Sequence, residues 1–366
     1  MGSFIAAHKS PKLLSSKSIQ IWRMVQVLVW LVGFAIFFCL LFYPAIGLIA
    51  FWNILIPVAP ALLVVATGLW RNICPLATTS LFPRHVNISK KRVMPIALQG
   101  KLQLAAIIAL FVIVPLRHLL FNTNGMATAI LLAFTAVTSV TMGLVYDWKS
   151  GWCNSLCPVS PVERLYGGNT LFTLHNAHCE SCAKCTVPCP DSTPNATPLI
   201  SRKTICSQLC GLITVGGLPG FIFGWFFIPD YPGNIRFYQV FEAYKMPALG
   251  FCISLTVYLL LKPYFSGKKE RFLTSCFAAA SVSFYYIFRI PALFGFGQFK
   301  TDVFLFNLTD IMPQWGMAII VVCTTMFFFW WLVFRDINRK SWMIRPEYTQ
   351  RHSAKKQPSP LTASKI

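Results

Sequence analysis

The amino-acid sequence predicts an all-α, polytopic membrane protein with a cysteine-rich segment between two groups of membrane-spanning helices. The chain is 55% hydrophobic and only 12% charged, and its mean hydropathy is +0.60. Soluble domains carry about 25% charged residues, roughly twice this fraction. Long apolar runs recur along the whole chain, with short polar connections between most of them. These observations favour a membrane bundle over a soluble fold.

Eight apolar runs are long enough to cross a hydrocarbon core of about 30 Å, which takes about 20 helical residues. The fifth run is interrupted by glycines and a proline, and the sixth is short. The predicted spans are Ile21–Phe42, Ile46–Leu69, Leu102–Phe121, Met126–Tyr146, Leu212–Ile228, Met246–Leu261, Phe272–Ile290 and Met317–Phe334.

The distribution of basic residues predicts the orientation of these spans. The net charge is +21, and 27 of the 32 Lys and Arg residues lie on one side when Arg23 is counted with the N-terminal tail. That bias indicates the cytoplasmic side, with both termini inside. No small-residue cleavage site follows the first apolar run, so we expect a retained signal-anchor helix. The predicted organisation is a tail (1–20), four helices with a cytoplasmic loop at 70–101 (21–146), a cytoplasmic cysteine segment (147–211), four helices (212–334) and a basic tail (335–366), disordered from Met343 onward.

The positive charge does not indicate nucleic-acid binding. The basic residues lie between apolar runs and do not form one patch interleaved with aromatic residues. Membrane lipid is therefore the expected partner of this charge, and no nucleic-acid partner is expected.

The cysteine segment contains the run C-x2-C-x2-C-x3-C-P, which is typical of bacterial-type ferredoxins and their [4Fe–4S] clusters. Its members are Cys179, Cys182, Cys185 and Cys189, followed by Pro190. Zinc sites usually use two separated C-x2-C pairs, and disulfide frameworks belong to small secreted chains. The spacing therefore favours an iron–sulfur cluster.

Four more cysteines in the same segment bring the number to eight, which is enough for two clusters. Cys153 and Cys157, followed by Pro158, resemble the closing half of a second ferredoxin run, and Cys206 and Cys210 lie downstream. In two-cluster ferredoxins the last cysteine of each run binds the other cluster. The partition that we favour places Cys179, Cys182, Cys185 and Cys157 on one cluster, and Cys189, Cys153, Cys206 and Cys210 on the other.

Cys74 belongs to a weak internal repeat. Trp70 precedes Cys74-Pro75, just as Trp152 precedes the motif that ends in Cys157-Pro158. A turn at Cys74-Pro75 is the simpler interpretation, and a redox role is the alternative. The cysteines inside apolar runs are expected to act as small hydrophobic residues. They are Cys39, Cys252, Cys276 and Cys323.

The sequence also limits other redox chemistry. There is no C-x2-C-H motif for a covalently attached haem, and His118 is the only histidine expected within a span, so a bis-histidine haem is not predicted. No nucleotide-binding or hydrolase motif is present. Arg117 and His118 form an adjacent ionisable pair near the outer end of the third span. The pair is a candidate for binding a quinone headgroup, although side chains at this depth also extend to the interface.

The motifs at Cys153–Pro158 and Cys179–Pro190 resemble those of membrane-bound polyferredoxins of the NapH and NosR type, which join a helical bundle to a cytoplasmic iron–sulfur segment. The resemblance is specific over roughly 150–190. Asn154 stands where that family usually has glycine, and only Cys206 and Cys210 stand in place of its second four-cysteine run. The sequence carries no large extracytoplasmic flavin-binding domain, so we do not expect a full NosR-like protein. The resemblance implies a bacterial cytoplasmic membrane protein.

Two functions of different classes follow as expectations. The first is an electron-transfer subunit that connects the quinone pool, or a cytoplasmic donor, to a partner redox enzyme. The second is an assembly factor, similar to FixG-type membrane ferredoxins, that supplies electrons while a metal centre of another enzyme is built. A structural subunit whose clusters brace a docking surface is a third reading. All three require the same cysteines, and no catalytic residue of the chain's own is predicted.

Overall fold

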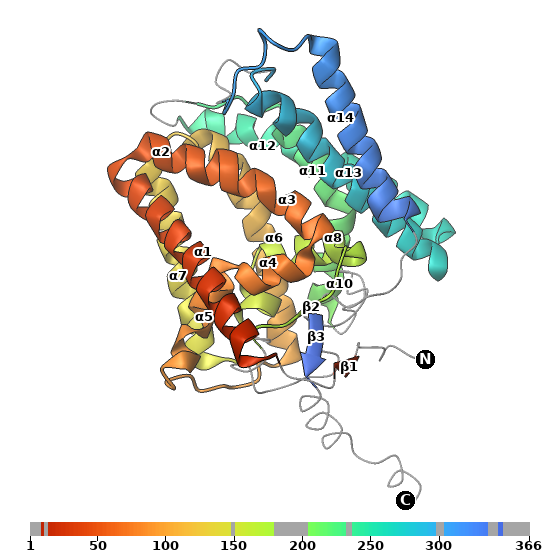
Figure 1. The fold of residues 1–366 in the computed structure, drawn as a ribbon. Coiled ribbons are helices and arrows are strands. Elements are labelled where there is room, and N and C mark those ends of the chain that lie inside the picture. The colour runs from red at the N-terminus through yellow and green to blue at the C-terminus, as the bar shows by residue number, and fades with distance from the viewer. Residues whose placement is uncertain are drawn as a thin grey trace, which may run out of the picture.

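The computed structural model describes residues 9–10, 14–147, 151–178, 204–231, 236–297, 304–335 and 343–346. Within these residues, eight helical segments are long and apolar enough to cross a membrane (Figure 1). Each corresponds to one predicted span, so the prediction of an all-α polytopic membrane protein is confirmed. The segments are Ser16–Phe42, Pro44–Val65, Ile96–Phe121, Gly125–Val145, Ile205–Trp225, Phe237–Tyr264, Lys269–Leu293 and Gln314–Phe334.

Several spans combine α-helix with a short stretch of π-helix, a form often found at functional positions. The first four spans consist of α1 (Ser16–Phe42); α2 (Pro44–Leu48), η1 (Ile49–Leu55) and α3 (Ile56–Val65); α6 (Ile96–Leu116) and η2 (Arg117–Phe121); and α7 (Gly125–Val145). The last four consist of α10 (Ile205–Leu212), η6 (Ile213–Gly217) and α11 (Leu218–Trp225); α12 (Phe237–Leu261) and η7 (Lys262–Tyr264); α13 (Lys268–Leu293); and α14 (Gln314–Phe329) and η8 (Trp330–Phe334).

Two helices occupy the beginning of the predicted loop 70–101. They are α4 (Thr67–Ile73) and α5 (Pro75–His85). The second span ends at Ala66, whose φ of −141° and ψ of 55° break the helix, and α4 follows in a new direction. Cys74 separates α4 from α5 in an extended conformation because a residue before proline disfavours the α region.

α5 packs along α7 and is part of the bundle. The hydroxyl of Ser139 donates a hydrogen bond of 3.1 Å to the carbonyl of Leu76. Gly143 lies so close to the backbone of Ser80 that a Cβ atom at this position would clash. The small residues of α7 therefore allow α5 to pack closely against it as a helix, although the polar composition of this segment predicts a loop.

A buried hydroxyl joins α13 to α3. The Tyr286 hydroxyl donates a hydrogen bond of 2.6 Å to the carbonyl of Pro57 and accepts one of 2.9 Å from the amide of Ala61. These two backbone groups would pair with each other in a regular helix, so the hydroxyl is inserted between them. Trp331 of η8 reaches the same helix, because its indole donates to the carbonyl of Val64.

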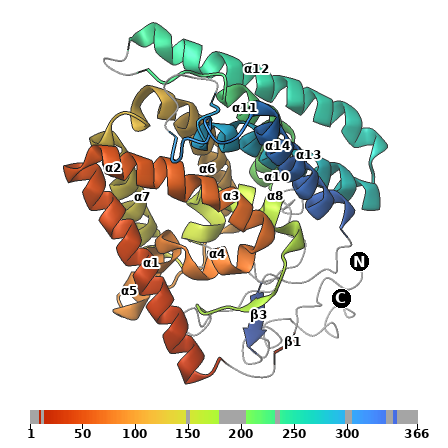
Figure 2. The same cartoon turned by 45° about the horizontal axis from the view of Figure 1, so that its top comes forward.

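The connection after α7 holds η3 (Trp152–Leu156), α8 (Val159–Tyr166) and η4 (Gly167–Asn169). Three short parallel strands follow the order β1-β3-β2. They are β1 (Lys9–Ser10), β2 (Leu174–His175) and β3 (Met343–Pro346). The first residues of the tail that the sequence predicts to be disordered thus pair with strands from two distant parts of the chain. Figures 1 and 2 show the strands at the end of the bundle where α1 and α10 begin.

Candidate functional sites

The four cysteines of the ferredoxin-like run lie outside the residues that the structure describes, which stop at His178 and resume at Thr204. The structure does describe both ends of this segment and the other four predicted ligands. These four ligands lie on η3, directly after η3 and on α10. The end of the bundle formed by η3, α10 and α4 is here called the thiol end.

The chain that leads into the run is fixed to α4. Asn72 is fully buried, and its side-chain amide donates a hydrogen bond of 2.9 Å to the carbonyl of His175. Its side-chain oxygen accepts one of 3.1 Å from the amide of Ala177. The ring of His178 lies 3.2 Å from the carbonyl of Arg71. Because His178 directly precedes Cys179, the first cysteine of the run lies one peptide unit from a point anchored on the bundle.

Arg71 and Glu163 form a buried ion pair beside this anchor. The guanidinium group donates two hydrogen bonds, of 2.7 and 3.0 Å, to the two carboxylate oxygens of Glu163. Both residues are about nineteen-twentieths buried, at 6% and 5% exposed. Burial lowers the pKa of Arg71, but the charge and hydrogen bond of Glu163, together with the nearby Cys153 and Cys157 side chains, outweigh burial, and the net pKa is raised. The pair joins α4 to α8, the helix that follows Cys157-Pro158.

Cys153 lies on η3 and Cys157 directly follows its last residue, and the structure brings Cys74 close to both. Cys74 and Cys153 pack against the same two buried residues of α5, and all three cysteines line one cavity. Burial raises the pKa of the Cys74 thiol and raises that of Cys157 well above its usual value. The weak repeat of Trp and Cys-Pro in the sequence was the only signal that these segments meet.

Cys206 and Cys210 lie one turn apart on α10, which begins with Thr204 as its N-cap. The buried thiol of Cys210 donates a hydrogen bond of 3.6 Å to the carbonyl of Gln103 on α6. The side chain of Gln103 donates one of 2.7 Å to the carbonyl of Asn154 on η3. Gln103 therefore connects α10 to the segment that carries Cys153 and Cys157.

Asn154, which departs from the polyferredoxin pattern, has a structural explanation. It is 1% exposed, and its carbonyl also accepts a hydrogen bond of 3.2 Å from Gln99. Its side-chain oxygen accepts one of 2.7 Å from Arg164, a guanidinium group whose burial lowers its pKa to about 10. An amide side chain at this position fixes η3 to α8 through a contact that glycine lacks.

The described thiols of the predicted ligand set occur as two pairs, one before and one after the anchored chain in the sequence. Among the residues that the structure describes, no three His, Cys, Asp or Glu side chains lie close enough together to hold a metal ion. The described cysteines therefore form no metal site by themselves, and the other four predicted ligands, at 179–189, lie outside the described residues.

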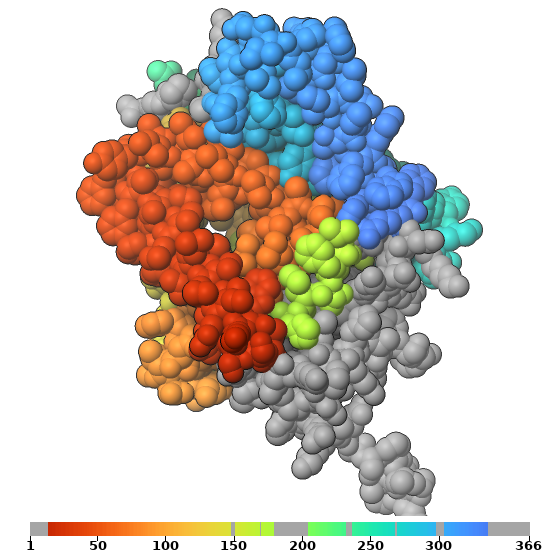
Figure 3. All heavy atoms as spheres, in the orientation of Figure 1, coloured from red at the N-terminus to blue at the C-terminus, as the bar shows by residue number. Residues whose placement is uncertain are grey.

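The cavity that Cys74, Cys153 and Cys157 share, here called the apolar cavity, has a volume of about 510 Å³. Most of its wall is apolar and comes from α1, η1, α3, α5 and α7. Arg71 and Glu163 lie in the same wall beside the thiols. Figure 3 shows the surface hollowed between α1 and α3.

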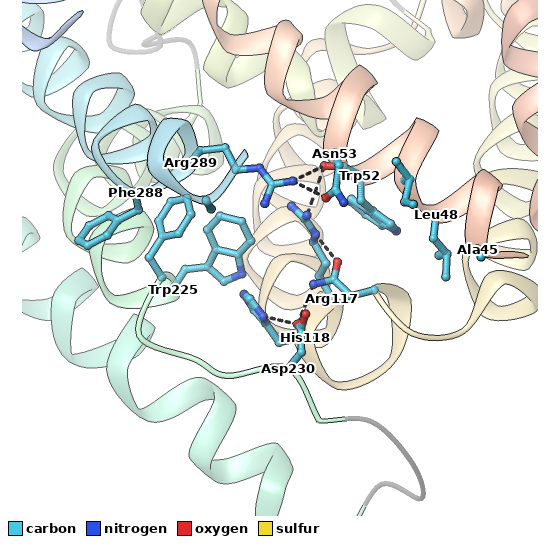
Figure 4. Close-up of a pocket in the computed structure, with 14 residues that line it drawn as sticks. Ala45, Leu48, Trp52, Asn53, Arg117, His118, Trp225, Asp230, Phe288 and Arg289 are labelled. Carbon is cyan, nitrogen blue, oxygen red and sulfur yellow. Dashed lines mark hydrogen bonds and ion pairs between the residues drawn. The ribbon is translucent and has the colours of Figure 1, made fainter. Parts of the chain in front are cut away.

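The predicted pair Arg117 and His118 lies in a second cavity, the arginine pocket, at the opposite end of α6 (Figure 4). Nδ1 of His118 lies 2.6 Å from a carboxylate oxygen of Asp230, which also accepts a hydrogen bond of 2.7 Å from Asn122. Arg117 donates a hydrogen bond of 2.5 Å to the side-chain oxygen of Asn122. Its Cζ atom lies 4.6 Å from the ring centroid of Trp52 and 5.2 Å from that of Trp225.

A second arginine, Arg289 of α13, enters the arginine pocket. Arg289 and Arg117 both donate to the carbonyl of Trp52, at 3.1 and 3.3 Å, and Arg289 also bonds the side-chain oxygen of Asn53. Asp230 is the one acidic residue in the described lining, so the lining carries one excess positive charge when His118 is neutral. The pocket has a volume of about 210 Å³ and suits a small group rich in hydrogen-bond acceptors. Sequence reasoning identified Arg117 and His118 but missed Asp230 and Arg289, which lie far away along the chain.

Comparison with known proteins finds no match among protein-family models, curated proteins or solved structures.

Proposed function

We propose that the chain is a membrane-bound iron–sulfur protein that relays electrons between the quinone pool, or a cytoplasmic donor, and a partner redox enzyme. Two [4Fe–4S] clusters bind to the eight cysteines 153, 157, 179, 182, 185, 189, 206 and 210, on the cytoplasmic side of a bacterial inner membrane. Each cluster carries one electron, and its potential is tuned by hydrogen bonds and charge around the sulfur ligands.

The observation that most supports this proposal is that the chain leading into the cysteine run, up to His178, is fixed to the membrane bundle. The side chain of Asn72 binds the backbone at His175 and Ala177, and the chain then continues through His178 into Cys179. A carrier that exchanges electrons with a membrane-dissolved partner needs such a fixed position, because electron transfer slows steeply with distance. A tethered but loosely placed ferredoxin segment would not need a buried asparagine for this purpose.

The arginine pocket is a further candidate for a quinone headgroup, as the sequence predicts. Its arginines would donate to quinone oxygens, and the His118–Asp230 pair would hold or release a proton. It lies about 21 Å along α6 from Gln103 at the thiol end, since fourteen residues separate Gln103 from Arg117 at 1.5 Å each. A quinone in this pocket would therefore need another carrier between it and the clusters.

The function is tested with anaerobically purified full-length protein in proteoliposomes. We expect decylubiquinol to reduce the clusters, or dithionite-reduced clusters to reduce decylubiquinone, as followed by electron paramagnetic resonance and visible absorbance. Cys182→Ala removes one proposed cluster ligand and should abolish this electron exchange. Cys323→Ala, which changes an exposed cysteine of α14, is the matched control and should leave it unchanged.

The assembly function predicts a different result. The assembly factor is favoured if two results are found together. The clusters exchange no electrons with either quinone form, and the partner enzyme lacks its metal when Cys182→Ala is present. Partner enzyme that keeps its metal in the same strain, while losing its supply of electrons, would favour electron transfer.

A further inference from the structure

The apolar cavity at the thiol end combines three features that belong to different parts of the chain. Its walls come from membrane-spanning segments, its polar end is the Arg71–Glu163 ion pair, and its thiols include two predicted cluster ligands. We propose that this cavity binds the ring of a membrane quinone and is the site at which quinone and clusters exchange electrons. The inference rests on the proposed function and specifies its site.

The cavity walls are suited to an isoprenoid quinone. A quinone consists of a flat ring with oxygen atoms at its edge and a long apolar tail. Three indole rings line the cavity, and the rest of its lining is mostly aliphatic or phenylalanine side chains. Flat aromatic walls accommodate a flat ring, as in most small-molecule sites. The three tryptophans are Trp30, Trp70 and Trp152.

The polar end provides the groups that a quinone or quinol ring requires. The Arg71 guanidinium is a donor suited to a quinone oxygen, and the Glu163 carboxylate is an acceptor suited to a quinol hydroxyl. Both groups are fixed by their mutual ion pair and lie in the cavity wall. A phospholipid acyl chain would satisfy the apolar wall but would place no polar atom against this pair. The chemistry of the polar end therefore favours a quinone over a lipid tail.

The cavity also has a route to the bilayer. The hollow between α1 and α3 in Figure 3 lies between two helices whose residues line the cavity. Phe34 of α1 and Leu55 of η1 belong both to the cavity lining and to the exposed apolar surface, at 46% and 38% exposed. A quinone can therefore enter sideways from lipid, with its tail remaining in the bilayer.

The position of the cavity relative to the cluster segment supports electron exchange. Arg71 lines the cavity, and its carbonyl oxygen lies 3.2 Å from Nε2 of His178. His178 directly precedes Cys179 in the sequence. Cys153 and Cys157 lie in the cavity wall itself. Oxidation of one quinol breaks two O–H bonds and releases two electrons and two protons. One electron passes to each of the two proposed clusters, and the protons leave to water.

A photoreactive azido-quinone locates the site on full-length protein, independently of cluster chemistry. We expect cross-links on the peptides of α1 and α7 that line the apolar cavity, and we expect excess decylubiquinone to suppress them. Cross-links confined to the arginine pocket, or spread over the lipid-facing surface without competition, would overturn the proposal.

A matched pair of variants on α7 links binding to electron transfer. Ala136→Phe places a large side chain in the cavity lining, whereas Val137→Phe adds the same ring to the neighbouring position, which is 65% exposed. The added phenyl ring would occupy the space of the quinone ring, so quinone labelling and the rate of cluster reduction by decylubiquinol should fall roughly tenfold or more in Ala136→Phe, which corresponds to about 1.4 kcal/mol or more of binding free energy. Val137→Phe should match the wild type.

The results distinguish the site from the function. If quinol reduces the clusters of the wild type and of Ala136→Phe at the same rate, the cavity is eliminated as the site and the proposed function remains in place. Wild-type clusters that respond to dithionite but not to quinol or quinone would eliminate the proposed function. If Ala136→Phe fails to fold, the labelling pattern of the wild type decides the site by itself.

Discussion

The side-chain amide of Asn72 donates a hydrogen bond of 2.9 Å to the carbonyl of His175, across 103 positions of the chain. This bond connects a helix of the bundle to the backbone that enters the cysteine run. Asn72 also accepts a hydrogen bond from Gln26 of α1 at its own carbonyl, at 2.9 Å. One buried residue thus holds together the first membrane span, α4 and the approach to Cys179.

The first prediction concerns this residue. Asn72→Ala removes two side-chain hydrogen bonds to the partly buried backbone of His175 and Ala177, at a cost of about 0.5–1.5 kcal/mol for each bond. We expect faster hydrogen exchange at 174–178 and a broadened cluster resonance. Asn87→Gly is the control, because Asn87 is exposed at a φ of 58°, which glycine adopts freely. Unchanged exchange in Asn72→Ala would show that the anchor is dispensable.

The second prediction concerns the Arg71–Glu163 ion pair. Arg71→Met or Glu163→Leu alone leaves an unpaired buried charge, which typically costs about 3–5 kcal/mol. The double variant removes both charges, and its loss of unfolding free energy should be much smaller than the sum of the single losses. Denaturant or thermal unfolding in detergent measures this difference. Additive losses would mean that the two side chains are stabilised independently.

The third prediction concerns cofactor content. Two [4Fe–4S] clusters require about eight iron atoms and about eight acid-labile sulfides per chain. Cys206→Ala should lower both values toward about four. Cys252→Ala, which changes an exposed cysteine of α12, should not affect them. Bound zinc, or about four iron atoms with no response to Cys206→Ala, would contradict the two-cluster assignment.

The fourth prediction concerns the Cys74 thiol in protein from which iron has been removed. Burial raises its pKa, so a smaller fraction is thiolate at a given pH, and the thiolate is the reactive form. Alkylation by iodoacetamide at pH 8 should therefore be slower than that of glutathione in the same buffer, and it should accelerate as the pH rises toward 10. Mass spectrometry of the Cys74 peptide measures the rate. A rate above that of glutathione would indicate a lowered pKa.

The fifth prediction concerns the contact between α11 and α12. Gly220 and Gly250 approach so closely that a Cβ atom on either would clash with the backbone carbonyl of the other. Gly220→Ile should destabilise the protein by more than the roughly 1–3 kcal/mol of ordinary overpacking, because backbone cannot move aside as a side chain does. Gly33→Ala is the control, since its Cβ would meet only Pro75 at 3.9 Å. Thermal unfolding in detergent distinguishes the two variants.

The sequence predicted the eight spans because a membrane requires long apolar runs, and such runs are visible without knowledge of tertiary contacts. It did not predict α5, whose eleven residues include three polar hydroxyls, an arginine and a histidine. This helix depends on the small residues of α7, among them Gly143, and those contacts link segments that are far apart in the chain.

The same limit applies to the candidate sites. Cysteine spacing predicts a ligand set because the motif is local, whereas the side chains that surround the described cysteines come from distant parts of the chain. Glu163 lies 92 positions from Arg71, and Asp230 lies 112 positions from His118. Hydrogen bonds at these separations follow from the packing of the bundle, which one sequence without related sequences does not reveal. Cys74 does lie at a break between two helices, as the turn interpretation expects, but its position beside Cys153 was not predicted, for the same reason.

The break at Ala66 has a consequence for the size of the apolar cavity. Because α3 ends there and α4 departs in a new direction, the second span stops before the thiol end and α4 forms the end wall of the cavity. The depth of the cavity is therefore set by the residue at which the chain turns. Inserting one residue before Ala66 would rotate Arg71 by about 100° and advance it by 1.5 Å, and so move it away from Glu163. The length of α3 therefore decides whether the Arg71–Glu163 pair lies in the wall of the apolar cavity.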